Sequence, residues 1–155
     1  HTLFPYTTLF RSSDSGNGID RALARGYAKP IDEFEGASAQ LSIFDRLPES
    51  AQRALLGASL QEREQFEAET RRLAQAWAHA DLDLIARETD GQLSSDPVLR
   101  EALLVGRNRA WTVRLDTMLK QGAHPFVAVG AAHLVGKDGL PAMLTAKGYK
   151  VTRLQ

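Results

Sequence analysis

The sequence predicts an α/β fold, rich in helix, in which short and mainly parallel strands are flanked by helices. Two observations carry this prediction. Residues 126–129 form an apolar run of β-branched and aromatic character with the length of a buried strand. Helix-like and strand-like segments then alternate toward the carboxyl end, an order that favours a right-handed crossover with parallel pairing.

The composition is typical of one globular domain with one core. The chain has 155 residues, of which 43% are hydrophobic and 25% are charged. Its 19 Lys and Arg balance its 19 Asp and Glu, so nothing favours a nucleic acid or an anionic membrane as a partner. The absence of cysteine excludes disulfides and thiolate metal sites, and no apolar run has the length of a membrane span.

The amino end does not read as natural protein. Residues 2–12 resemble, residue for residue, the translation of a common short-read sequencing adapter. We therefore expect residues 1–12 to be a non-native segment with no role in the core. Residues 13–155 are then expected to be the carboxyl-terminal part of a single domain whose natural protein continues upstream. The alternative is a genuine aromatic-rich strand.

Short elements are expected before residue 50. Pro30 prevents a helix from continuing and favours an extended backbone at Lys29, the residue before it. Leu41 and Phe44 recur at helical spacing. The expected elements are a helix over 19–27, a strand over 31–35, a helix over 37–45 and a helix that begins near Glu49.

Residues 51–80 are strongly helical in composition. Their apolar stripe predicts a face packed on the core. Asp81 and Asp96 are expected to cap the next helices, with Pro97 at the first helical position. The stripe consists of Phe66, Thr70, Leu73 and Trp77.

Residues 98–121 predict the longest helix, closed by Gly122. Two apolar stripes lie on this helix, with arginines between them. An unpaired charge in such a place costs several kcal/mol, so an arginine there needs a partner unless, like Arg100 and Arg114, it lies toward a helix end and can reach water. Arg107 is central and has the strongest need of a carboxylate or an anionic ligand, although a structural salt bridge would also satisfy it. One stripe holds Leu99, Leu103, Gly106, Ala110 and Val113, the other holds Leu104, Trp111, Leu115 and Met118, and the arginines are Arg100, Arg107 and Arg114.

The carboxyl end predicts one more helix and a last strand. The helix covers 138–147, with Asp138 as its cap and Gly148 as its stop. Residues 149–154 are expected to form a strand with Val151 inward.

Two titratable side chains are expected at strand ends, where α/β proteins keep their sites. Glu35 ends one strand, and His133 follows the apolar run after a small-residue turn. Together they can share a proton or a divalent metal ion, but two ligands make an incomplete catalytic site. A histidine that only ties down its loop is the alternative. Residues 130–138, GAAHLVGKD, are one residue too long for a phosphate loop and end in Asp138, so no nucleotide is expected.

Several short motifs follow one another in a fixed order. They are Phe34-Glu35 through Gln40, Leu47-Pro48, Arg107-Asn108 with Trp111, Gly130-Ala131-Ala132-His133-Leu134 with Gly136, and Gly148-Tyr149. In this order and spacing they resemble the TraB/GumN family, which includes PrgY-like pheromone shut-down proteins and the Tiki metalloproteases. The resemblance runs from about residue 16 to the end. It implies a fragment of a TraB/Tiki-like domain of the erythromycin-esterase/ChaN-like kind.

The resemblance also implies site residues. Residues 130–133 match the second of two Gly-x-x-His motifs, Glu35 matches a conserved glutamate, with Phe34 where leucine is usual, and Arg107 matches a conserved arginine. Glu35 and His133 would ligate or flank the metal, and Arg107 would orient Glu35 or hold a substrate oxygen. The first Gly-x-x-His has no match here, so this fragment by itself is expected to be a weak metal binder and a poor enzyme.

The resemblance implies a metal-dependent hydrolase, peptidase-like, acting on a peptide or other small substrate in the bacterial cell envelope or periplasm. The alternative is a non-catalytic protein that captures a peptide, haem or another ligand in the same polar pocket. A structural role in export or polysaccharide assembly is a third possibility. The sequence leaves substrate, metal and oligomeric state open.

Overall fold

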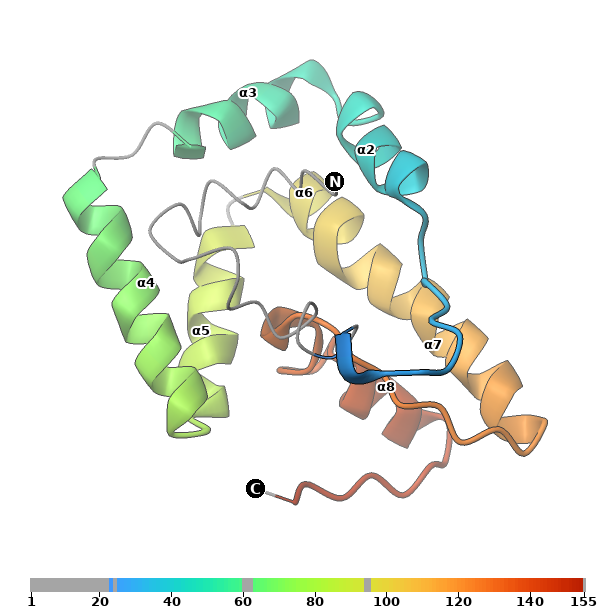
Figure 1. Ribbon diagram of the computed structural model, residues 1–155. Coiled ribbons are helices and arrows are strands. Elements are labelled where there is room, and N and C mark those ends of the chain that lie inside the picture. The colour runs from blue at the N-terminus through green and yellow to red at the C-terminus, as the bar shows by residue number, and fades with distance from the viewer. Residues whose placement is uncertain (1–22, 24, 60–62, 94–95, 155) are drawn as a thin grey trace.

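The computed structural model describes residues 23, 25–59, 63–93 and 96–154, and this part of the chain is helical (Figure 1). No helix in this part is both long and apolar enough to cross a membrane. The elements are α2 (Ala37–Asp45), α3 (Glu49–Ser59), α4 (Arg63–Ala78), α5 (Leu82–Leu93), α6 (Pro97–Arg100), the π turn η3 (Glu101–Val105), α7 (Gly106–Lys120), the 3-10 turn η4 (Ala131–His133) and α8 (Leu140–Ala146).

The predicted α/β class is wrong, because the described residues contain no strand. A strand needs a ladder of backbone hydrogen bonds to a neighbour, and none of the three expected strands, over 31–35, 126–129 and 149–154, has one within the described ranges. The parallel crossover is therefore absent as well. Phe126 is 74% exposed and Val151 is 45% exposed. Side chains in a buried strand would be much less exposed than this.

The segment before His133 is extended and packs on one side only. Val127 and Val129 are half-buried and contact the cluster around Trp111. Phe126 and Ala128, which alternate with them, are exposed. The period of two expected for a strand is present, so the composition was informative about the local backbone. What the sequence alone did not reveal is that this segment has no hydrogen-bonded partner strand among the described residues.

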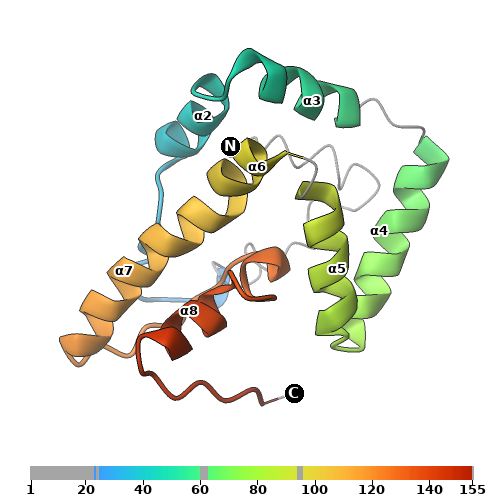
Figure 2. The ribbon, with the colours of Figure 1, turned by 180° about the vertical axis from the view of Figure 1, so that it is seen from behind.

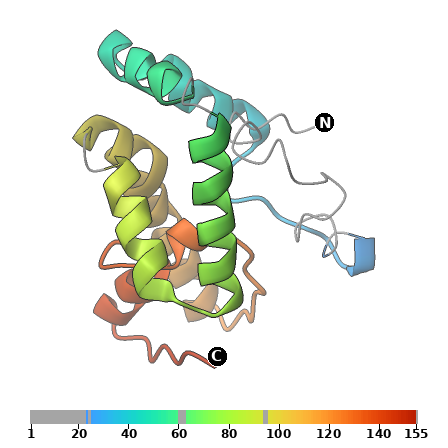
Figure 3. The same cartoon turned by 90° about the vertical axis from the view of Figure 1, so that its left-hand side faces the viewer.

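The helices before residue 100 largely follow prediction. Helices α2 and α3 lie at one end of the molecule, and α4 and α5 form a pair side by side (Figures 1 and 3). Asp81 accepts a hydrogen bond from the Leu84 amide at 2.9 Å, and Asp96 accepts from Val98 and Leu99, so both predicted caps are confirmed. The predicted helix over 19–27 lies almost wholly outside the described residues.

The core stripe predicted on α4 is wrong in part. Trp77 is 65% exposed, and the residue of this helix that is buried is Ala76, packed against Ile85 of α5 and Val135. Leu73 and Thr70 are half-buried, and the side chain of Phe66 lies outside the described part. The helix is thus rotated so that its small residues, rather than its tryptophan, face α5.

The long helix over 97–120 is confirmed, but it is not uniform. A π turn, η3, interrupts it between α6 and α7, and the Gly106 amide bonds the Glu101 carbonyl, five residues back. One added residue per π turn rotates everything after it by about a quarter of a turn relative to a regular α-helix. The predicted stripe is therefore correct at Leu99 and Leu103 but wrong at Val113, which is 56% exposed.

Three small apolar clusters take the place of one continuous core in the described part. The first joins α3 to α6 and η3, the second joins α4 to α5, and the third joins α7 to α8 (Figure 2). Their buried members are Leu47, Ala51, Leu99 and Leu103, then Ala76, Ile85 and Val135, then Trp111, Leu115 and Leu140.

Helix α8 starts later than predicted. Gly139 rather than Asp138 precedes its first residue, and the helix stops before Gly148, which adopts a φ of 92°.

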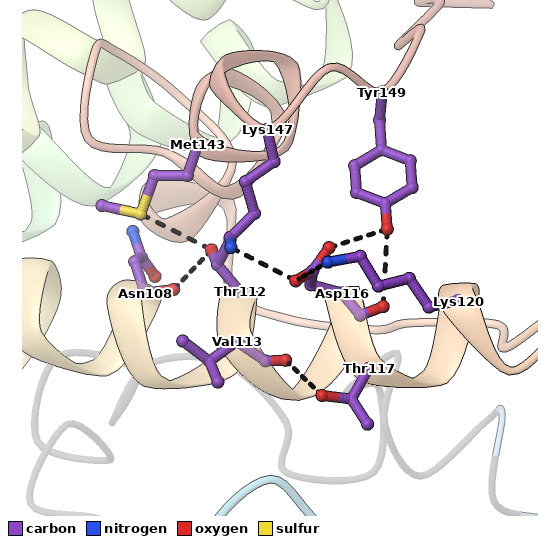
Figure 4. Close-up of polar contacts among 9 residues, drawn as sticks. All are labelled: Asn108, Thr112, Val113, Asp116, Thr117, Lys120, Met143, Lys147 and Tyr149. Atoms are coloured by element: carbon purple, nitrogen blue, oxygen red, sulfur yellow. Dashed lines mark hydrogen bonds and ion pairs between the residues drawn. The ribbon is translucent and has the colours of Figure 1, made fainter.

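Asp116 on α7 holds the chain that follows α8. Its carboxylate accepts from Lys147 at 3.3 Å and from the Tyr149 hydroxyl at 2.8 Å (Figure 4). In the same region, the Thr112 hydroxyl donates to the Asn108 carbonyl at 2.7 Å and lies 3.5 Å from the Met143 sulfur.

Candidate functional site

Glu35 and Arg107 meet in the structure. Arg107 Nε lies 3.0 and 3.2 Å from the two carboxylate oxygens of Glu35, and Nη2 lies 3.0 Å from Oε2. The two side chains are only 17% and 16% exposed, so the pair is largely removed from water. The prediction that Arg107 needs a partner is therefore confirmed, and the partner is a carboxylate from the extended segment before α2.

The other two arginines of this helix also have carboxylate partners. Arg100 Nη2 lies 2.7 Å from Asp138 and 3.2 Å from Asp90. Arg114 pairs with Asp32 and donates to the Glu33 carbonyl at 2.6 Å. Arg107 and Arg114 thus anchor the same extended segment, residues 32–35, to the helix, while Arg100 anchors Asp90 and Asp138.

Trp111 is the centre of the site, although the sequence analysis had named it only as part of an apolar stripe and of a family motif, with no role of its own. Its indole Nε1 donates to Glu35 Oε1 at 2.9 Å. Its ring stacks on Phe34, lies 4.7 Å from the Arg107 guanidinium carbon, and meets the His133 ring at a centroid distance of 4.5 Å. The spacing of four residues between Arg107 and Trp111, which puts both on one helix face, was the available signal.

His133 contacts the same tryptophan and is bonded to Asn108 rather than to the Glu35 carboxylate. Its Nδ1 is 2.6 Å from Asn108 Oδ1, and Asn108 in turn donates from Nδ2 to the Asp138 carbonyl at 2.7 Å. Asn108 is fully buried. Helix α7 therefore presents Arg107 to Glu35 and Asn108 to His133 from adjacent positions.

Burial, together with the nearby positive charge of Arg107, lowers the pKa of His133 from 6.5 to about 4. The imidazole is therefore uncharged at neutral pH. A neutral ring has one nitrogen that donates and one that carries a lone pair.

Asp138 holds the loop that receives Asn108. Its carboxylate accepts from Arg100 at 2.7 Å and from Lys137 at 2.8 Å, and both interactions lower its pKa. The predicted role of Asp138 as a helix cap is thus replaced by an ion pair to α6. Gly139 follows, and a Cβ at this position would lie 2.6 Å from the Val135 carbonyl oxygen, so the loop closes tightly here.

The residues of the site do not form a complete metal centre. No group of three His, Cys, Asp or Glu that could hold an ion occurs among the described residues. The Glu35 oxygens already accept from Arg107 and Trp111, and the guanidinium charge next to them disfavours a second cation. The best available donor is the second ring nitrogen of His133, which supplies one ligand where a catalytic zinc takes three.

The comparisons with known proteins identify the family. The model of the TraB/PrgY/gumN family matches residues 8–153. The chain belongs to this family. Neither the curated proteins nor the solved structures gave a match.

The TraB/PrgY/gumN match includes every motif from which the resemblance was drawn, Glu35, Arg107 and His133 among them. It starts at residue 8, inside the segment expected to be non-native. That segment lies outside the described residues, so its origin stays a prediction, as do the catalytic and metal-binding roles of the three side chains.

Proposed function

We propose that this TraB/PrgY/gumN domain supplies part of a peptidase-like hydrolase site. The hydrolase acts on a peptide or another small acyl substrate in the bacterial cell envelope or periplasm. The observation that carries the proposal is the state of His133. Its Nδ1 is engaged by Asn108 at 2.6 Å, and burial keeps the ring uncharged. A neutral imidazole presents a lone pair that can accept a hydrogen bond from an attacking water and orient it at neutral pH.

Arg107 supplies a fixed positive charge beside this histidine. Glu35 holds the Nε edge of its guanidinium, and Trp111 lies against it, so the group is oriented without being neutralised completely. A guanidinium has five N–H donors, more than these contacts use. We assign the remaining donors to a carbonyl or carboxylate oxygen of the substrate, where they would stabilise developing negative charge.

A divalent metal enters this proposal only through His133. When bound in such a site, a metal lowers the pKa of its water to about 7. Because the described residues fit one ligand and not a full set, a metal-dependent mechanism would need donors from residues outside the described part, and no step is assigned to a metal here.

A ligand-binding protein is the second candidate. The lack of a three-ligand group among the described residues favours it, since the same oriented arginine and histidine can recognise a peptide or another ligand without turning it over. In this case Arg107 and His133 contribute to affinity and not to a rate.

The experiment is hydrolysis of a fluorogenic peptide library by the product of the full natural reading frame and by the present chain, with and without Zn²⁺, Mn²⁺ or Co²⁺. His133→Gln and Arg107→Met should each lower kcat/KM about 100-fold or more. Arg109→Met is the matched control, because Arg109 is exposed on the same helix and pairs with Glu101 at 2.8 Å. Peptide binding that depends on His133 but is not followed by turnover would favour the binding protein. The absence of both binding and turnover would reject both functions.

A further inference from the structure

Asn108 is a buried polar side chain whose role the proposed function does not yet include. It is 0% exposed and lies on α7 between Arg107 and the buried turn that carries Trp111 and Thr112. Both ends of its amide have partners from other segments of the chain: the Asp138 carbonyl and the His133 ring. A side chain buried this completely, and bonded at both ends, has one orientation available.

The orientation of that amide follows from its partners. The Asp138 group 2.7 Å away is a backbone carbonyl, which can only accept a hydrogen bond, so the amide NH₂ must face it. The amide oxygen must then face His133, where it lies 2.6 Å from Nδ1. Because an amide oxygen can only accept, Nδ1 must carry the hydrogen.

We propose that Asn108 is a positioning residue that holds neutral His133 in the Nδ1–H tautomer, so that the Nε2 lone pair is the working nitrogen of the site. The inference rests on the proposed function for the importance of His133, but the tautomer itself rests only on the contacts. Within the described residues, Nε2 has no hydrogen-bond partner that would compete with this assignment.

The surroundings of Asn108 resist a flip of the amide. The Asp138 carboxylate is held by Arg100 at 2.7 Å and Lys137 at 2.8 Å, and this fixes the carbonyl that accepts from Asn108. A flipped amide would set its oxygen against the Asp138 carbonyl oxygen and its NH₂ against Nδ1. It would therefore exchange two good hydrogen bonds for one lone-pair repulsion and a change of tautomer.

The His133 ring is also in contact with Trp111. Trp111 packs against the His133 ring at 4.5 Å, which fixes the plane of the imidazole while Asn108 fixes the proton. In solution the Nε2–H tautomer of a neutral imidazole is the more populated one. An enforced Nδ1–H tautomer is consequently a signature that a loop histidine without this partner would not have.

The test is a two-bond ¹H–¹⁵N correlation spectrum of the ¹⁵N-histidine chain at pH 7, with His133 signals assigned by their loss in His133→Gln. We expect a pyrrole-type shift for Nδ1 and a pyridine-type shift for Nε2. Asn108→Leu should move the two shifts toward each other or exchange them.

The matched control is Thr112→Val, one turn further along α7, which removes a buried hydroxyl that bonds the Asn108 carbonyl without contacting His133. It should leave the tautomer unchanged. A wild-type spectrum with the proton on Nε2 would overturn the proposal, and so would a folded Asn108→Leu variant with an unchanged pattern. If Asn108→Leu does not fold, the wild-type spectrum still decides.

The spectrum is recorded without substrate, so its outcome is separate from the fate of the proposed function. An enforced Nδ1–H tautomer in a protein that neither hydrolyses nor binds peptides would retain the positioning role and reject the function. In an active enzyme, Asn108→Leu should lower kcat with little change in KM, because Asn108 acts through His133 and has no contact of its own with substrate.

Discussion

The Glu35 carboxylate and the Arg107 guanidinium lie 72 positions apart in the sequence and form an ion pair with a 3.0 Å contact between Oε2 and Nη2. The pair joins the extended segment before α2 to the middle of α7. Both side chains are less than one-fifth exposed, so each depends on the other for compensation of its charge.

Breaking this pair from one side should therefore destabilise the fold. We expect Arg107→Met and Glu35→Gln each to lower the free energy of unfolding by about 3 kcal/mol, because each leaves a largely buried polar group without its partner. The double variant should lose much less than the sum of the two. Urea unfolding of the four proteins measures this coupling.

The control for that cycle is the pair of Arg53 and Glu49 on α3, whose side chains are 78% and 76% exposed at a distance of 2.7 Å. Arg53→Met should cost less than about 1 kcal/mol. If the loss at Arg107 were as small as the loss at Arg53, the site would not be the desolvated cluster described here.

The arginine pattern shows how far the sequence could be followed. Arg107 lies between two apolar stripes, and the cost of an unpaired charge there is large enough to demand a partner whatever the fold. Glu35 was proposed as a strand end and as a match to the family glutamate; the strand is absent from the described residues, but the Glu35 carboxylate accepts hydrogen bonds from Arg107. The centre of the site was harder to find, because Trp111 fits an apolar stripe and its N–H donor matters only once Glu35 is next to it.

The strands could not be judged from local sequence. Residues 126–129 have strand composition and do alternate between exposed and half-buried positions, but a ladder depends on a second segment far away in the chain. The π turn was hidden for a different reason. It is a register shift of one residue, and the apolar pattern before Gly106 is the same with or without it.

Gly106 provides a prediction about that turn. A Cβ at this position would lie 2.8 Å from the Glu101 carbonyl oxygen, which is backbone and cannot move without reshaping η3. We expect Gly106→Ala to lower the free energy of unfolding by about 1–2 kcal/mol, since overpacking outweighs the gain of about 1 kcal/mol in helix propensity. Thermal or urea unfolding measures the change.

The sign of the effect is what matters, and Gly57 provides the comparison. It lies in α3, and a Cβ there would have no atom within 4 Å. Gly57→Ala should raise stability by about 0.5–1 kcal/mol. Stabilisation of similar size by Gly106→Ala would show that the π turn is not built around a glycine.

Asp116 should hold down the chain after α8. Lys120, the Tyr149 hydroxyl and Lys147 all donate to its carboxylate and lower its pKa to about 2 (Figure 4). The folded pKa is below the ordinary value of 3.8, so this stabilisation is present above pH 3.8 and is lost as the pH falls through about 2. Asp116→Asn should speed amide hydrogen exchange around Tyr149 at pH 7, and Glu69→Gln on the exposed face of α4 should not.

The buried state of His133 also makes stability depend on pH, but here the folded protein disfavours the charged form of the side chain, whereas at Asp116 it favours the charged form. Its pKa is near 4 in the folded chain and near 6.5 when unfolded, so protons favour the unfolded state between these values. Between pH 6.5 and 4 the free energy of unfolding should fall by about 3 kcal/mol on account of this residue. Carboxylates titrate in the same range, so the measurement is the difference in slope between wild type and His133→Gln. An unchanged slope would mean that the imidazole is solvated in the folded protein.

The last prediction concerns metal binding by the chain as it stands. His133 offers one free ring nitrogen, and the Glu35 oxygens are held by Arg107 and Trp111. A guanidinium stays protonated and cannot ligate, and its charge opposes a cation placed next to Glu35. A single imidazole binds Zn²⁺ far more weakly than the three-ligand set of a catalytic site.

We therefore expect calorimetric titration of the chain with Zn²⁺, Mn²⁺ or Co²⁺ to show only weak binding, with little difference between wild type and His133→Ala. His124→Ala serves as the control for incidental imidazole binding at the surface. Arg107→Met should not create a site, because it removes a repulsive charge but adds no ligand. Tight one-to-one binding that His133→Ala abolishes would instead show that residues outside the described ranges complete the centre around His133, and it would move the proposed hydrolase from an incomplete site to a metal-dependent one.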